Sequence, residues 1–149
     1  MGMLIDNEFT VNAPAATVMT YLLDVEKVAK CLPGAQLTQI VDAQTYKGKM
    51  KIKMGPLDLT FNGTVNIVEM DNENGRIVMK ASGMEEKGKG MAQATATVQI
   101  TDMGNSTHVK LSQDINMSGQ VAQFGRGMIA DVAGTMIKNF ATCLSQSIR

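Results

Sequence analysis

Apolar and polar residues alternate along most of the chain between residues 4 and 117. In the clearest run, Tyr46 to Met54, four lysines alternate with glycine, methionine and isoleucine. Side chains along a strand point to opposite faces with a period of two, so the lysines should lie on a wet face and the methionines on a dry one. The other alternating segments are residues 4–11, 57–69, 77–81, 92–100 and 109–117. The pattern predicts one strand, two short helices and six further strands, in a seven-stranded antiparallel sheet with one apolar face.

The two short helices are expected directly after the first strand. Pro14 suits the first turn of a helix, where its missing N–H costs nothing. Asp24 can cap a second helix, which should run to about Cys31 and end at Pro33-Gly34.

The apolar period changes from two to about 3.6 at Val121. From Val121 to Ile148 the chain therefore predicts an amphipathic helix of about 28 residues, roughly 42 Å long. A sheet with one dry face must cover that face, and this helix is the only expected element large enough to do so. We expect an α+β fold in which a curved antiparallel sheet wraps around the long C-terminal helix. No linker or internal repeat interrupts the chain, so residues 1–149 are interpreted as a single domain.

Small residues occupy many inward positions of the expected strands and recur in the long helix. They are Gly48, Gly63, Ala81, Gly83, Ala92, Ala94 and Ala96 on the strands, and Gly125, Gly127 and Gly134 on the helix. A glycine inside a helix costs about 1 kcal/mol relative to alanine, so some benefit should offset it. Close packing of helix on sheet is one explanation, and a ligand cavity between them is the other.

Composition and charge exclude several function classes. The 14 acidic and 14 basic residues balance, which gives no electrostatic case for nucleic-acid binding. No apolar run approaches the length of about 18 residues that spans a bilayer, and the first residues lack the features of a signal peptide. Methionine is frequent, at 13 residues, and its flexible side chain suits either core filling or a lining that adapts to a ligand.

We find no catalytic or metal-ligating constellation, and we expect neither catalysis nor a cofactor. His108 is the only histidine and should be solvated, as should the adjacent carboxylates Glu85 and Glu86. Cys31 and Cys143 lie far apart, and we expect two buried free thiols in a reducing cytosol, although a disulfide remains the alternative.

Two polar residues interrupt otherwise apolar faces. Asn7 and Gln113, if buried, must pair with the backbone or offer a polar group to a ligand. The four-lysine face, Lys47 to Lys53, should be a solvated strand face, with an anionic lipid or an acidic partner as the alternative.

The order of elements resembles the START-like superfamily, also called SRPBCC, whose helix-grip fold encloses a hydrophobic cavity. Three motifs are similar to the CoxG family of carbon monoxide dehydrogenase subunits. They are Cys31-Leu32-Pro33-Gly34-Ala35, then Lys51-Ile52-Lys53-Met54-Gly55-Pro56-Leu57 with Phe61-Asn62-Gly63, and Gly119-Gln120-Val121-Ala122-Gln123-Phe124-Gly125. The resemblance implies an accessory role beside a molybdenum hydroxylase, in maturation, membrane recruitment or electron transfer to the quinone pool. Fuller-length relatives carry a membrane-associating C-terminal extension, and this chain stops at Arg149.

We therefore expect a non-catalytic cytoplasmic protein, peripheral at most at the inner membrane face, that binds a quinone or lipid-like molecule. The alternatives are a START-like cyclase or hydrolase acting on a hydrophobic substrate, and an assembly subunit with a filled core. The predicted lining of the ligand site is Met50, Ile52, Met54, Phe61, Met79, Ala94, Ala96, Met117, Phe124, Met128 and Val132.

Overall fold

The order of helices and strands follows the sequence prediction in a computed structural model that describes residues 2–148. The strands are β1 (Met3–Val11), β2 (Ala35–Ile40), β3 (Thr45–Met54), β4 (Leu57–Asp71), β5 (Arg76–Glu85), β6 (Met91–Asp102) and β7 (Thr107–Ser118). The helices are α1 (Ala15–Leu22), α2 (Val25–Cys31), the short 3₁₀ helix η1 (Gln120–Gln123) and α3 (Arg126–Ile148).

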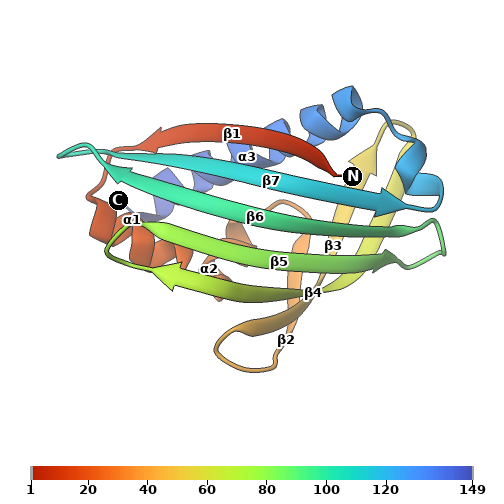
Figure 1. Ribbon diagram of the computed structural model, residues 1–149, viewed down its shortest axis with the longest axis horizontal. Coiled ribbons are helices and arrows are strands. Elements are labelled where there is room, and N and C mark those ends of the chain that lie inside the picture. Colours follow the sequence, from red (N-terminus) through yellow and green to blue (C-terminus); the bar gives the residue numbers. More distant parts are fainter. Residues whose placement is uncertain (1, 149) are drawn as a thin grey trace.

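One antiparallel sheet contains all seven of these strands, in the order β1-β7-β6-β5-β4-β3-β2 (Figure 1). Strands β2 to β7 follow one another as neighbours, while β1 pairs with β7 at the far edge. The chain must therefore cross from one edge of the sheet to the other between β1 and β2. Helices α1 and α2 make this crossing, and Asp24 caps α2 by accepting a hydrogen bond from the Lys27 backbone N–H, as predicted.

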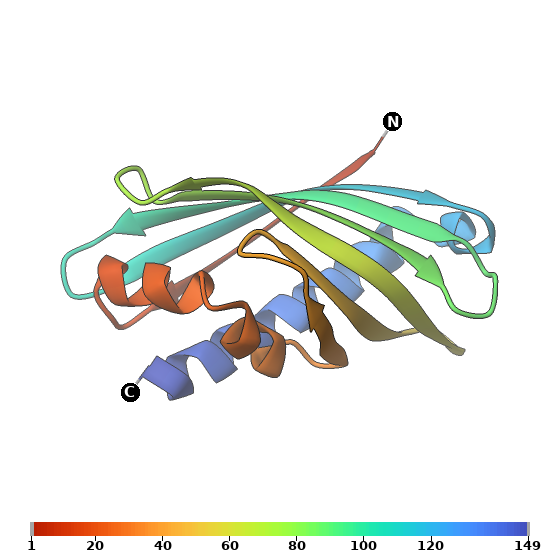
Figure 2. The ribbon, with the colours of Figure 1, turned by 90° about the horizontal axis from the view of Figure 1, so that it is seen from below.

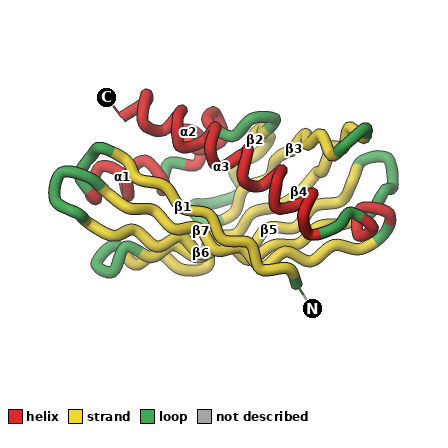
Figure 3. Tube along the Cα trace, turned by 90° about the horizontal axis from the view of Figure 1, so that it is seen from above, coloured by secondary structure: helices red, strands yellow, loops and turns green. Residues whose placement is uncertain are grey.

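All three α-helices lie on the same side of the sheet (Figure 2). Figure 3 shows α3 lying across the strands on that side, beside α2. Helix α3 packs most extensively against β1 and also approaches β3, α1 and α2. The sheet face that α3 covers is called the inner face below.

The long helix is shorter than the sequence predicts. Gly119 has a φ of 78°, η1 follows it, and Phe124 is extended, so α3 begins only at Arg126 and has 23 residues. The apolar residues of 121–124 belong to a separate turn that happens to continue the helical spacing. Only Gly134 of the three glycines therefore lies well inside α3.

Two clusters of buried side chains occupy the two ends of the space between α3 and the sheet. The α1 cluster joins α1 to the C-terminal half of α3 and includes Val18, Phe140 and Leu144. In it, Phe9 and Phe140 meet edge to face, with ring centroids 6.3 Å apart. The η1 cluster lies under the start of α3 and consists of Ile5, Met54, Leu59, Phe61, Val121 and Ile129.

Two of the small inward residues are explained by the curvature of the sheet. A Cβ at Gly63 would lie within 3 Å of the Ser82 carbonyl oxygen, and one at Gly48 would lie 2.7 Å from the Gln36 carbonyl oxygen. Neighbouring backbones approach too closely there for any side chain. These glycines, paired across β3 and β4, let the sheet bend around α3.

Candidate functional site

The middle of the inner face is packed less completely than its two ends. On β5, Ile77 and Glu85 are buried, whereas Met79, Ala81 and Gly83 between them are half-buried. Strand β4 repeats the pattern, with Phe61 and Ile67 buried and positions 63 and 65 half-buried. On β1 the buried residues are Ile5 and Val11, and positions 7 and 9 between them are half-buried. The partly buried positions thus form a band across the sheet, between the α1 cluster and the η1 cluster.

The register of the strands aligns this band. Val65, Ala81, Ala94 and Ile115 pair directly across β4, β5, β6 and β7. None of these four residues belongs to either buried cluster as a fully buried member. We call the region over this row and its neighbours the central band.

The predicted lining residues fall into four groups. Met54 and Phe61 are buried in the η1 cluster, and Ile52, Met117, Phe124 and Val132 pack against it. Met79 packs against the α1 cluster. Met50, Ala94 and Ala96 are half-buried inner-face residues outside both clusters. Met128 is 37% exposed and lies near Gly55, at the turn between β3 and β4.

Two surface clefts lie outside the central band and contain none of the predicted lining residues. The larger, about 470 Å³, lies between the α1–α2 connection and the β2–β3 hairpin and is lined by Thr20, Leu23, Asp24, Val25, Glu26, Ile40 and Tyr46. The smaller, about 250 Å³, is lined by Val11, Asn12, Ala13, Pro14, Thr17, Ser145 and Ile148. Tyr46 of the larger cleft pairs with Val65, so this cleft adjoins the row that crosses the central band.

Asn7 and Gln113 both lie on the inner face, as the sequence indicates. Asn7 pairs with Leu111, and Gln113 pairs with Ile5 and Ala96, which makes the two amides diagonal neighbours on β1 and β7. The Oδ1 atom of Asn7 is buried and has no hydrogen-bond partner within the residues that the structure describes. A methyl group at Gly134 would lie 3.9 Å from Asn7 Nδ2, so the side chain lies beneath α3.

The prediction that Glu85 is solvated is wrong. Strand β5 extends to Glu85, whose side chain is only 4% exposed. Its carboxylate accepts backbone hydrogen bonds from Thr60, Lys87 and Lys89, over 3.0, 2.7 and 3.3 Å respectively. These bonds, that from Thr60 first, lower the pKa of Glu85 below its usual value and keep the carboxylate ionised. Glu85 thus fixes the β5–β6 turn, a role that alternation of apolar and polar residues does not reveal.

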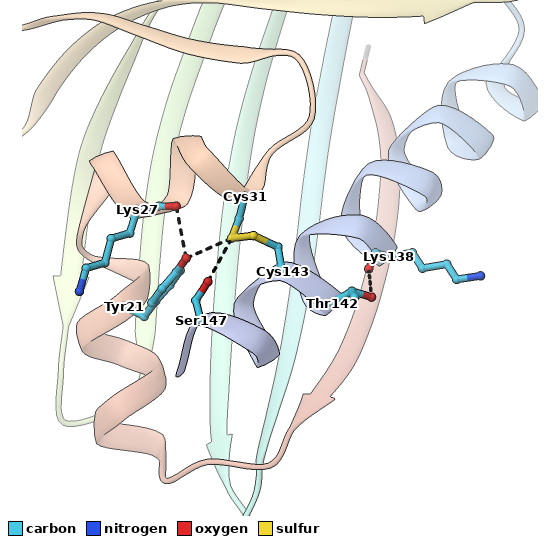
Figure 4. The surroundings of a disulfide bond; sticks show 7 residues. All are labelled: Tyr21, Lys27, Cys31, Lys138, Thr142, Cys143 and Ser147. Atoms are coloured by element: carbon cyan, nitrogen blue, oxygen red, sulfur yellow. Dashed lines mark hydrogen bonds between the residues drawn. A yellow bond between two sulfur atoms is a disulfide. The ribbon is translucent and has the colours of Figure 1, made fainter. Parts of the chain in front are cut away.

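The prediction of two free thiols is also wrong, because Cys31 and Cys143 form a disulfide with a Cα–Cα distance of 5.4 Å. Figure 4 shows the bond joining the end of α2 to α3, with Tyr21 and Ser147 beside it. The Tyr21 hydroxyl lies 3.1 Å from Cys31 Sγ and donates to the Lys27 carbonyl over 3.3 Å. The two cysteines are 112 residues apart, so the bond ties the crossing helices to the C-terminal helix.

Other polar residues match the simple expectations. His108 is half-buried, with its Nε2 3.7 Å from a Glu8 carboxylate oxygen. The four lysines of β3 alternate outward and are exposed. Within residues 2–148, no group of three or more His, Cys, Asp or Glu side chains could hold a metal ion. The helices of this same stretch are too short or too polar to cross a bilayer.

A curved antiparallel sheet that grips a long C-terminal helix defines the START-like, helix-grip class of proteins, and solved structures bear this out. A conserved protein from Geobacillus kaustophilus superposes with a TM-score of 0.87 at 18% identity, covering 98% of this chain and 95% of that one. An aromatase/cyclase from Streptomyces gives a TM-score of 0.71 at 12% identity, covering 99% and 94%. A START superfamily protein from Mycobacterium smegmatis gives 0.65 at 17% identity, covering 99% and 97%. At these identities the likeness establishes the fold alone.

The family is established by sequence. The model of CoxG, a family of carbon monoxide dehydrogenase subunits, matches residues 8–149, so the chain belongs to this family. No curated protein sequence is significantly similar to the chain. The resemblance drawn from the three sequence motifs is thereby confirmed.

Proposed function

We propose that this protein is a non-catalytic carrier of a hydrophobic small molecule, held in the central band between the sheet and α3. It would serve a molybdenum hydroxylase of the carbon monoxide dehydrogenase type. The observation that carries the proposal is the interrupted packing of the inner face, which is buried at both ends and half-buried in between. Interiors of proteins normally pack without voids larger than a water molecule, so a middle section of this kind favours a guest.

The lining chemistry supports an apolar ligand. Met50, Ala94 and Ala96 would contact it first, because they lie outside both clusters. Met79 and Met117 are half-buried at the borders of the band, and their unbranched side chains can adapt to different shapes. The remaining predicted residues would hold the ends of the ligand or support its walls.

The larger surface cleft suits an entry route. Its Tyr46 pairs with Val65, and Val65 pairs with Ala81 inside the band. A ligand entering beside Tyr46 would meet the central band along one row of paired residues.

An isoprenoid quinone or a lipid is the ligand class that fits both an apolar band and a redox enzyme as partner. The family name gives the connection to carbon monoxide dehydrogenase, and the carrier would desolvate the molecule and present it to that enzyme. Peripheral contact with the inner membrane face, from the cytoplasm, is part of this proposal.

A cyclase or hydrolase of the same fold is the competing function, since an aromatase/cyclase shares the fold. Such chemistry needs a titratable group whose pKa is shifted toward neutrality. The pKa of the buried carboxylate of Glu85 is lowered instead, and its oxygens are occupied by three backbone N–H groups. Glu85 therefore suits a structural role, which favours the carrier.

The proposal is tested by filling the band. Ala94→Phe places a ring in its middle, whereas Gln93→Phe places the same ring on the exposed outer face of β6. Binding of decylubiquinone, measured by isothermal titration calorimetry, should be lost in Ala94→Phe and retained in Gln93→Phe.

Folding of the variants gives a second readout. If the band holds space, Ala94→Phe remains folded by circular dichroism, because the ring occupies the ligand's place. If the core is filled, overpacking should cost about 1–3 kcal/mol and lower the melting temperature, which would support an assembly subunit instead.

A further inference from the structure

One polar atom on the inner face has no use in the fold. Asn7 Oδ1 is a buried acceptor without a hydrogen-bond partner, the one such side-chain atom found in residues 2–148. Buried polar groups in proteins are nearly always paired, so an unpaired acceptor calls for an explanation. Alternation places the residue between Ile5 and Phe9, where an apolar side chain would pack without this penalty.

The surroundings of Asn7 leave the amide facing the central band. Its neighbour across the strands is Leu111, and Gly134 on α3 lies above it without a side chain. Gly134 lowers helix stability relative to alanine, and its missing side chain leaves α3 open over the amide.

A second amide lies next to the first. Gln113 is the diagonal neighbour of Asn7 and pairs with Ala96, a predicted lining residue. Both amides stand on adjacent strands at the β1–β7 side of the band, opposite the side where the larger cleft opens. A ligand that enters beside Tyr46 and crosses the band would bring its leading end to this pair.

We propose that Asn7 selects ligands that carry a hydroxyl group, by accepting a hydrogen bond from that hydroxyl at Oδ1. The inference rests on the proposed carrier function and adds a ligand class to it. That class is an apolar molecule with an O–H donor at one end, such as a phenol, a long-chain alcohol or the reduced form of a quinone. A ligand that offers only acceptor oxygens leaves Asn7 Oδ1 unpaired and binds more weakly, since a donor-lacking analogue strands the buried acceptor.

The test compares two probes that differ only in the donor, 2-naphthol and its methyl ether, 2-methoxynaphthalene. Their dissociation constants are measured by fluorescence for the unmodified protein, for Asn7→Leu and for Asn62→Leu. Asn62 is an exposed asparagine on the outer face of β4 and serves as the matched control. Asn7→Ala is measured as well, so that the result does not depend on how one side chain packs.

The unmodified protein and Asn62→Leu should prefer 2-naphthol by about five- to tenfold, the value of one neutral hydrogen bond. Both Asn7 variants should bind the two probes equally. Asn7→Leu should also melt at a higher temperature without ligand, because the unpaired acceptor is gone.

Two results overturn the inference in different ways. A preference for 2-naphthol that persists in both Asn7 variants assigns the hydroxyl to another group and leaves the carrier function intact. Failure of the unmodified protein to bind either probe or decylubiquinone removes the carrier function, and the inference with it.

Discussion

Reduction of the Cys31–Cys143 disulfide should destabilise the protein more than any single side-chain deletion considered above. The bond closes a loop across a sequence separation of 112 residues. The chain-entropy relation for a loop of that length gives about 4.8 kcal/mol at 25 °C. With an unfolding entropy of about 2.1 cal/mol/K per residue for a chain of 149 residues, this corresponds to a fall in melting temperature of roughly 15 °C.

The assay is thermal unfolding followed by circular dichroism, with and without a phosphine reductant. The double variant Cys31→Ala/Cys143→Ala is the matched control, since it should melt at the same temperature in both conditions. A fall of under about 3 °C in the unmodified protein would refute the reasoning, because the loop entropy alone predicts several times more. Alkylation of both thiols in the folded, unreduced protein would refute the pairing itself.

Three further substitutions test individual contacts. Glu85→Gln should lower the urea midpoint at pH 7 while exposed Glu86→Gln does not. The lowered folded-state pKa stabilises the protein above the unfolded value, about 4.5, so the Glu85→Gln deficit should shrink as titrations move to acid below it. Thr107→Val should cost about 1–3 kcal/mol in urea unfolding, since the fully buried hydroxyl donates to the Ala13 carbonyl over 2.7 Å. Gly134→Ala should raise the free energy of unfolding by up to about 1 kcal/mol, because a methyl group there makes only ordinary contacts. Gly63→Ala should lower the free energy of unfolding instead, since its methyl group would collide with the neighbouring backbone.

The sheet was predictable because alternation reports directly which face of a strand is buried. Tyr46–Met54 illustrates this, with its lysines exposed and its other side chains facing α3, and β3 ends at Met54 as predicted. The covering role of the C-terminal helix followed from the same argument. Its first residue did not, because the apolar spacing of Val121 and Phe124 is equally compatible with a 3₁₀ turn before Arg126.

The disulfide and the role of Glu85 depend on contacts between distant segments. Cys31 and Cys143 meet only because the crossing helices place α2 beside α3, and nothing local to either cysteine encodes that distance. Glu85 looks like one of two solvated carboxylates until the β5–β6 turn brings three backbone N–H groups to it. A turn with two glycines after an inward-pointing acid is the signal that could have found it.

The candidate site was partly accessible from sequence. Asn7 and Gln113 stood out as polar positions on apolar faces, and both lie on the inner face. That Asn7 Oδ1 has no partner could not be predicted, because satisfaction depends on the height of α3 above β1. The small residues carry mixed information, since Gly48 and Gly63 serve the bend of the sheet while Ala94 and Ala96 remain candidates for the lining.

The methionines offer the most direct measurement of the central claim, that an apolar ligand lies between the sheet and α3. The 13 methionine methyl groups can be labelled with carbon-13 and observed by nuclear magnetic resonance during titration with decylubiquinone. Binding in the central band should shift the methyl signals of Met50, Met79 and Met117 and leave those of Met84 and Met103, which are 61% and 60% exposed, unchanged. Shifts confined to Met84 and Met103, or no shifts at all, would contradict a ligand held inside the fold.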